Sequence, residues 1–321
     1  MDGGERIGMG LKAAFVDFVF ENREAIRLEG CEFTIYPPLR TAAELIAAAQ
    51  DADILMMRDQ FGRITAEVLA GCPRLKLIVT RSAGYDHIDL AAAQARGIVV
   101  CNVPDYGAHM IAEHAFALML AVARNVCRGN ARYRQERRFD DTGLGGVELY
   151  GKTLGVIGTG RIGRHSVRIG KGFGMEIMAY DVAPDERLAA EQGFQYGSLE
   201  EVLAHSDFIT LHVPLLESTR HLINATTLAH IKPGAILVNT SRGAIVDTAS
   251  LKEALASGRL RGAGLDVLED ERTVYHDFED LNVVITPHLG WYTEEARDRI
   301  LRISLENVRS WMEGHPIHRL V

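Results

Sequence analysis

Short hydrophobic runs rich in β-branched residues alternate with longer stretches of helical periodicity along almost the whole chain. This alternation predicts βα units, and therefore parallel sheets. The runs form a first series at 12–18, 32–37, 52–58, 75–81 and 98–103, and a second at 153–158, 176–181, 208–214, 235–241, 262–267 and 282–288. Because most runs lack polar alternation, we expect strands that helices cover on both faces.

Two longer helices are predicted outside these series. One spans about 108–126, between the series, and the other lies within 293–314. The later helix carries hydrophobic residues at helical spacing, which we expect to pack on the first series: Ile300, Leu301, Ile303, Leu305, Val308 and Trp311. The chain would then cross between two domains twice.

We therefore predict an α/β protein with two doubly wound parallel sheets. A flexible N-terminus is expected at 1–10, a first domain at 11–106 plus 292–321, and an inserted domain at 107–291. The length of 321 residues and the 47% hydrophobic content are sufficient for two cores.

The charge, the apolar runs and the cysteines of the chain indicate which partners and which cellular compartment to expect. The formal net charge is −8, and the densest basic run, 132–138, is interrupted by Gln135 and Glu136, so we expect neither a nucleic-acid nor a membrane partner. The longest apolar run, 115–123, is too short for a bilayer span, which needs about 20 residues. The first ten residues lack the apolar core of a signal peptide. The 4 cysteines are far apart without a CxxC pair, which indicates reduced thiols and a cytoplasmic protein.

A glycine-rich turn is the first candidate for chemistry. Gly158, Gly160 and Gly163 have GxGxxG spacing between a predicted strand and a predicted helix, where backbone N–H groups can meet a pyrophosphate. The spacing alone is weak support, because an ordinary tight turn would share it. Asp181 ends the next predicted strand, where an acid can accept hydrogen bonds from an adenosine ribose. Asp181 would repel a 2′-phosphate and no arginine follows it closely, so NAD is favoured over NADP.

The ends of the later strands carry further candidates. Ligands of doubly wound sheets bind beyond the carboxyl ends of the strands. Polar and aromatic residues gather at these positions: His212, Arg242, Asp266, Glu271, His288 and Trp291. A guanidinium is costly to remove from water, so we expect Arg242 to bind an anion, although it could instead cap a carbonyl or pair with Asp247. This combination predicts a site that binds an acid and moves a proton.

An ordered set of motifs resembles the D-isomer-specific 2-hydroxyacid dehydrogenase family. The motifs are "RSAGYDHIDL", "VPDYGAHMIAEHA", "GKTLGVIGTGRIG", "LHVPLLESTRHLIN", "KPGAILVNTSRGAIVD", "GAGLDVLEDE" and "ITPHLGWYTEEA". The resemblance covers nearly the whole chain after the first ten residues. It implies a Rossmann NAD-binding domain inserted in a flavodoxin-like substrate domain, in a homodimer. The segments "DVLEDE" and "HLGWYTEEA" are most similar to the D-lactate and 2-keto acid reductase branch.

The same resemblance implies a catalytic set of Arg242, Glu271 and His288. His288 would protonate the substrate carbonyl while NADH delivers hydride, and Glu271 would pair with the other ring nitrogen. Arg242 would fork to the substrate carboxylate and carbonyl oxygen. Glu269 and Asp270 compete with Glu271 for this role, and only the family register separates them.

The remaining predicted contacts follow from the same resemblance. Substrate would contact Ser82, Ala83, Gly84, Tyr106, Arg242 and Trp291. NAD would contact Gly158, Gly160, Arg161, Ile162, Gly163, Asp181, His212, Val213, Pro214, Thr219, Thr240, Ser241, Asp266 and Gly290. Arg161 could lie along the pyrophosphate or remain solvated. No metal site is predicted, because "HMIAEH" does not have HExxH spacing.

The predicted function is an NAD-dependent oxidoreductase that interconverts a small 2-keto acid and the D-2-hydroxy acid. One alternative is an NAD(H)-sensing, corepressor-like binding protein on the same scaffold. Another is a phosphite-type dehydrogenase. The segment after Glu271, "RTVYHDFEDLNVV", is shorter than in many lactate-type members and does not begin with proline, which leaves the keto acid open.

Overall fold

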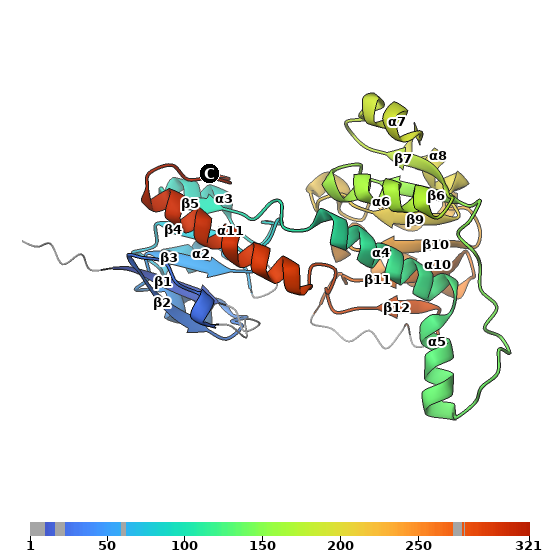
Figure 1. The fold of residues 1–321 in the computed structure, drawn as a ribbon, viewed down its shortest axis with the longest axis horizontal. Coiled ribbons are helices and arrows are strands. Elements are labelled where there is room, and N and C mark those ends of the chain that lie inside the picture. Colours follow the sequence, from blue (N-terminus) through green and yellow to red (C-terminus); the bar gives the residue numbers. More distant parts are fainter. Residues whose placement is uncertain (1–9, 17–22, 59–61, 272–277, 279) are drawn as a thin grey trace, which may run out of the picture. The chain divides into compact units, whose positions relative to one another are not determined.

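The structure is a computed structural model that describes residues 10–16, 23–58, 62–271, 278 and 280–321. The chain divides into two compact units, Met1–Tyr106 with Thr293–Val321, and Gly107–Tyr292. Each unit is built on one parallel sheet (Figure 1). The predicted α/β class with two parallel sheets is therefore confirmed.

The first unit has the strand order β2-β1-β3-β4-β5, with every pair parallel. Its strands are β1 (Leu11–Val16), β2 (Cys31–Tyr36), β3 (Ile54–Met57), β4 (Leu77–Thr80) and β5 (Val99–Cys101). This is the flavodoxin-like order, which reverses between β1 and β3. A short 3-10 helix, η1 (Arg23–Ala25), precedes β2.

Alternate residues of these strands enter two different cores. Ala14 and Val16 pack toward α1 (Ala42–Ala49), α2 (Ala66–Ala70) and α3 (Leu90–Ala95). Ala13 and Phe15 belong to the other core, which α11 (Glu294–Met312) completes with residues such as Leu301 and Val308. Because both faces are covered, the strands are hydrophobic without alternation, as parallel sheets require.

The second unit has the order β12-β11-β10-β9-β6-β7-β8, again with parallel pairs. Its strands are β6 (Thr153–Ile157), β7 (Glu176–Tyr180), β8 (Gln195–Tyr196), β9 (Phe208–Leu211), β10 (Ala235–Asn239), β11 (Leu260–Leu265) and β12 (Val283–Ile285). The order reverses between β6 and β9, as in a Rossmann sheet, and ligands bind at such reversal points. The sequence did not predict β8, because two residues carry no periodic pattern.

Two layers of helices cover the second sheet. On β10, Ile236 and Val238 pack toward α4 (Ala108–Ala123), α6 (Arg161–Gly172) and α7 (Glu186–Gln192). Leu237 faces the opposite core with α8 (Leu199–His205), α9 (Ala225–His230) and α10 (Thr248–Ala256). The described part of this unit also contains the 3-10 helices η4 (Glu217–Thr219) and η5 (Gly243–Ile245).

The helix predicted at 108–126 ends earlier than expected. Asn125 adopts a left-handed conformation with φ of 52° and separates α4 from α5 (Val126–Ala131) and the π-helix η3 (Arg132–Glu136). The Asn125 side chain donates to the carbonyl oxygens of Leu144 and Gly145, both at 3.2 Å, which holds the break. In the described residues no single helix has the length and apolarity to cross a membrane, although Ala108–Ala123 and Val126–Glu136 meet that test together, bent by 63°.

Candidate active site

The glycine-rich turn brings the backbone of α6 close to the end of β6. Gly158 has φ of +94°, and a Cβ there would lie 2.9 Å from the carbonyl oxygen of His212. A Cβ on Gly163 would lie 2.0 Å from the carbonyl oxygen of Gly158, so only glycine permits this approach. Gly160 is the N-cap of α6 and provides no side-chain cap, which leaves the N-terminal N–H groups without that partner. The turn therefore suits an anion at the helix N-terminus.

Asp181 follows β7 and is hydrogen-bonded to this turn. Its Oδ2 accepts from the backbone N–H of Thr159 at 2.7 Å and from Thr159 Oγ1 at 3.0 Å. Burial alone would raise the pKa of Asp181, but these donors and the Ala183 and Val182 N–H groups hold it below its usual range. A negative charge thus stands beside the turn. Thr159 was missed by sequence analysis because it occupies a variable position of the glycine motif.

His212, predicted to contact NAD, joins β9 to α6 through its side chain. Its Nε2 lies 2.8 Å from Ser166 Oγ and 3.0 Å from Thr210 Oγ1. Burial lowers the pKa of His212 to about 3, so the ring is neutral at pH 7. Its Nδ1 is buried and has no hydrogen-bond partner among the described residues.

Arg242 lies in a turn that a buried asparagine holds. Asn239, at the end of β10, donates through Nδ2 to the Arg242 carbonyl at 2.9 Å and accepts from Ser241 N–H at 3.0 Å. Arg242 Nη1 donates to the Ser241 carbonyl at 3.0 Å, so the carbonyl-capping alternative is present in the structure. Asp247 instead caps α10, accepting from Ser250 N–H at 3.2 Å.

Gly243 connects the Arg242 turn to the segment that carries Glu271. A Cβ on Gly243 would lie 2.0 Å from both the carbonyl carbon and the carbonyl oxygen of Leu268 and 2.4 Å from Glu269 N. The two backbones are therefore in direct contact. This contact sets the position of residue 242 relative to the chain that follows β11.

His288 pairs with Glu271, as predicted. Its Nδ1 lies 3.2 Å from Glu271 Oε1. Glu269, one of the two rivals of Glu271 in the sequence, pairs with a different histidine, because its Oε1 lies 2.6 Å from His221 Nε2. The structure therefore distinguishes Glu269 from Glu271. The His288 backbone has φ of 54°, an uncommon value for a residue with a side chain. Its N–H donates to the carbonyl of Asp266 at 2.8 Å.

Asp266 organises the segment around His288. The residue is buried, with 2% of its surface exposed. Oδ1 accepts a hydrogen bond from Leu289 N–H at 2.7 Å and lies 3.1 Å from His114 Nε2. Oδ2 accepts from Gly290 N–H at 2.8 Å. Burial alone would raise the pKa of Asp266, but its donors, including His114 and Thr286, hold it below its usual range. Asp266 is one of the predicted NAD contacts, whereas His114 was not predicted because its partner is distant along the chain.

The predicted substrate contacts at 82–84 form a turn after β4 in the first unit. Ser82 Oγ donates to the Gly84 carbonyl at 2.8 Å. The Ala83 carbonyl accepts from Asn102 Nδ2 at 2.9 Å. These bonds hold the turn at the carboxyl end of the strand.

The aromatic candidates lie in different units. Tyr106 is buried in the first unit, and its carbonyl accepts from Arg299 Nε on α11 at 2.6 Å. Trp291 belongs to the second unit and contacts Tyr292 edge-on, with ring centroids 5.0 Å apart.

The other predicted NAD contacts lie in the second unit. Thr219 Oγ1 donates to the Pro214 carbonyl at 2.6 Å and closes that turn. Thr240 Oγ1 is buried without a partner among the described residues. Arg161 is exposed at the first position of α6. Val213 approaches the Gly158 turn, and a Gly158 Cβ would lie 2.9 Å from its Cγ1. Ile162 lies in α6.

Comparison with known proteins gives a family match. The model for "D-isomer specific 2-hydroxyacid dehydrogenase, NAD binding domain" matches residues 116–290. The chain is 41% identical over 280 residues to glyoxylate reductase of Pyrococcus furiosus, covering 84% of this chain and 82% of that protein. It is also 41% identical over 272 residues to D-3-phosphoglycerate dehydrogenase of Mycobacterium tuberculosis, covering 84% of this chain. The chain spans 51% of that dehydrogenase, about half its length.

A solved structure extends the similarity to the whole fold. D-lactate dehydrogenase from Aquifex aeolicus, complexed with NAD and lactic acid, has a TM-score of 0.85 and 34% identity, covering 94% of this chain and 96% of that one. Together with the match to an NAD-binding domain, this confirms the predicted fold and NAD as the cofactor.

Proposed function

Because the chain belongs to the D-isomer-specific 2-hydroxyacid dehydrogenase family, we propose that it is an NAD-dependent oxidoreductase of small 2-keto acids. It would interconvert a 2-keto acid and the corresponding D-2-hydroxy acid. The observation that carries this proposal is the pair between His288 Nδ1 and Glu271 Oε1 at 3.2 Å. A histidine oriented by a carboxylate is a common arrangement for proton transfer.

The glycine turn and Asp181 would hold NAD. A pyrophosphate fits where Gly158 and Gly163 bring two backbone segments together, at an α6 N-terminus without a side-chain cap. Asp181 would accept from the adenosine ribose. The bound dinucleotide supplies the hydride in reduction.

The protein residues would bind the acid and move the proton. Glu271 on Nδ1 favours the charged imidazole and leaves a transferable proton on Nε2 of His288. In reduction that proton passes to the carbonyl oxygen as the carbonyl carbon gains hydride. In oxidation the hydroxyl proton returns to His288. Arg242 would donate to both the substrate carboxylate and the carbonyl oxygen.

The direct experiment is to follow NADH oxidation with pyruvate, glyoxylate, hydroxypyruvate and phenylpyruvate, and to determine the configuration of the product. The proposal predicts turnover of at least one acid and a D-product. Arg242→Ala should lower kcat/KM by about a hundredfold or more, because the carboxylate loses a charge-assisted partner. Tight NADH binding without turnover of any acid would favour the binding-protein alternative instead.

We also propose that the protein is a homodimer. Several large hydrophobic side chains of the second unit are exposed along α5 and the chain after it: Val126 at 57%, Tyr133 at 60%, Phe139 at 96% and Tyr150 at 76%. This segment extends away from the sheet of its own unit (Figure 1). Tyr133 and Phe139 contact each other edge to face, with ring centroids 6.2 Å apart, and adjoining exposed apolar groups of this kind are typical of protein–protein interaction sites. Phe139→Asp should convert the dimer to a monomer by light scattering, whereas Val182→Asp, at a position 85% exposed elsewhere, should not.

We propose that the protein is located in the cytoplasm, because its four cysteines are typical of a reducing compartment. Cys31, Cys72, Cys101 and Cys127 are all free thiols in the structure. Burial raises the pKa of Cys101 to about 11, which makes it unreactive. A reduced and an untreated sample should therefore show the same thiol count by Ellman titration.

A further inference from the structure

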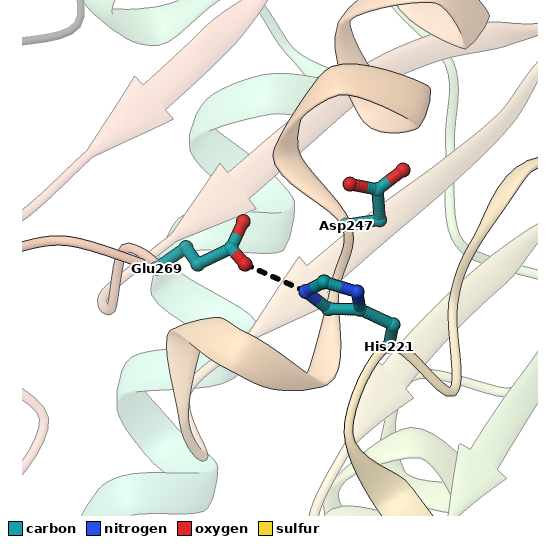
Figure 2. Close-up of side chains that lie close together, drawn as sticks. All are labelled: His221, Asp247 and Glu269. Atoms are coloured by element: carbon teal, nitrogen blue, oxygen red, sulfur yellow. Dashed lines mark hydrogen bonds and ion pairs between the residues drawn. The ribbon is translucent and has the colours of Figure 1, made fainter.

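Three side chains meet beside the segment that carries Glu271: His221, Asp247 and Glu269 (Figure 2). His221 follows η4, Asp247 is the N-cap of α10, and Glu269 follows β11. His221 Nε2 donates to Glu269 Oε1 at 2.6 Å. One potential ligand atom from each residue lies within 4.8 Å of the other two. The three residues therefore come together from three separate segments of the sequence.

Glu269 is held from both sides. Its other oxygen, Oε2, accepts from Thr248 Oγ1 at 2.8 Å and from Thr248 N–H at 3.3 Å. Burial alone would raise the pKa of Glu269, but the donors from His221 and Thr248 hold it below its usual range. The carboxylate therefore carries a charge and bridges His221 to the first turn of α10.

His221 is also fixed through its backbone. Its φ of 50° is left-handed, and its N–H donates to the Ala244 carbonyl at 2.9 Å. The Asn224 side chain donates to the His221 carbonyl at 2.8 Å. Because Ala244 follows Gly243, the histidine is connected both to the Arg242 turn and, through Glu269, to the segment of Glu271.

We propose that His221 and Glu269 form a clamp that positions Arg242 and Glu271 for the reaction. The clamp acts through the contact of Gly243 with Leu268 and Glu269, which joins the two segments. His221 and Glu269 are positioning residues and transfer no proton to substrate. This inference rests on the proposed function, because Arg242 and Glu271 have their roles from it.

A hydrogen bond, not a metal ion, holds the clamp. Each carboxylate already accepts from protein donors: Glu269 from Thr248, and Asp247 from the backbone N–H of Ser250 at 3.2 Å. A side chain that keeps a donor at the Nε2 position should therefore replace the histidine. Glutamine provides such a donor, whereas leucine fills similar space without one.

The test compares His221→Leu, His221→Gln and the exposed control His230→Leu. Each protein is measured for kcat/KM across pH, for NADH affinity by fluorescence, and for hydrogen exchange of peptide 265–271. His221→Leu should lower kcat/KM by about tenfold. It should also move the alkaline limb of the reduction profile to lower pH, speed exchange and leave NADH affinity unchanged. His221→Gln should recover most of the wild-type values.

A double variant completes the test. His221→Leu with Glu269→Leu should be no worse than Glu269→Leu alone, because Glu269→Leu already removes the His221 contact together with the Thr248 contacts. The clamp is overturned if His221→Leu matches His230→Leu in pH profile and exchange, or if EDTA alone reproduces the His221→Leu behaviour. Absence of wild-type turnover on every keto acid refutes the proposed function instead, and the exchange rates of peptide 265–271 in the single and double variants then decide the clamp separately.

Discussion

The carboxylate of Glu271 lies against Nδ1 of His288, with Oε1 at 3.2 Å. The two residues are brought together from segments that follow β11 and β12, which are neighbouring parallel strands. A carboxylate at this nitrogen orients the ring and stabilises its charged form. The pH behaviour of the enzyme should therefore depend on Glu271.

Glu271→Gln keeps the size of the side chain but removes its charge. Reduction needs the charged imidazole, so kcat/KM should fall by about tenfold to a hundredfold, and the alkaline limb of the profile should move to lower pH. Steady-state NADH oxidation from pH 5 to 10 measures both effects. Glu253→Gln, an exposed control on α10, should match the wild type. A Glu271→Gln profile that coincides with the wild type would contradict the pairing.

Asp181→Asn tests the choice between NADH and NADPH. The asparagine oxygen can still accept from Thr159, but the negative charge that repels a 2′-phosphate is gone. The ratio of kcat/KM for NADH over NADPH should fall by about tenfold or more. Glu186→Gln, exposed nearby at the start of α7, should leave the ratio unchanged. An unaltered ratio in Asp181→Asn would mean that discrimination arises elsewhere.

Asp266→Asn should destabilise the second unit by about 2–4 kcal/mol at pH 7, because a buried hydrogen-bonded anion is lost. The folded pKa of Asp266 lies below its ordinary value near 3.8, so its stabilisation is complete above that value and disappears as pH falls through the folded pKa. The difference between wild type and variant should therefore shrink in acid. Denaturant unfolding followed by Trp291 fluorescence at pH 7 and pH 3 measures it, in a Trp311→Phe background because Trp311 lies in the first unit. Asp298→Asn, which is exposed, is the control, and a difference that grows in acid would refute this assignment.

Gly243→Ala places a methyl group where the backbone of Leu268 already lies, at 2.0 Å. The Arg242 turn must then move away from the Glu271 segment. We expect a loss of stability of about 1–3 kcal/mol and a loss of kcat/KM at unchanged NADH affinity. Gly172→Ala is the matched control, because nothing lies within 4 Å of its Cβ position. Equal behaviour of the two variants would show that the segments are not in close contact.

The sequence predicted the parallel sheets because strands buried on both faces have an unmistakable hydrophobic pattern. Ile236, Leu237 and Val238 on β10 illustrate it, since each is buried in one of the two opposing cores. It also predicted the glycine turn, whose spacing follows from local backbone geometry. It missed β8 and the break at Asn125, since both depend on contacts with distant segments.

Partners of predicted residues were harder to find than the residues themselves. His114 on α4 reaches Asp266, and His221 reaches Glu269, across long stretches of sequence. No local pattern identifies such pairs, because any of the 12 histidines could be placed beside any acid. The structure separates Glu269 from Glu271 by giving each a different histidine.

The most direct test of the central claim is the turnover of His288→Gln with the best keto acid, together with its NADH dissociation constant. A proton donor at this position predicts a fall in kcat of about a hundredfold to ten-thousandfold, with NADH affinity within about twofold of the wild type. Turnover near the wild-type rate in His288→Gln would contradict the account.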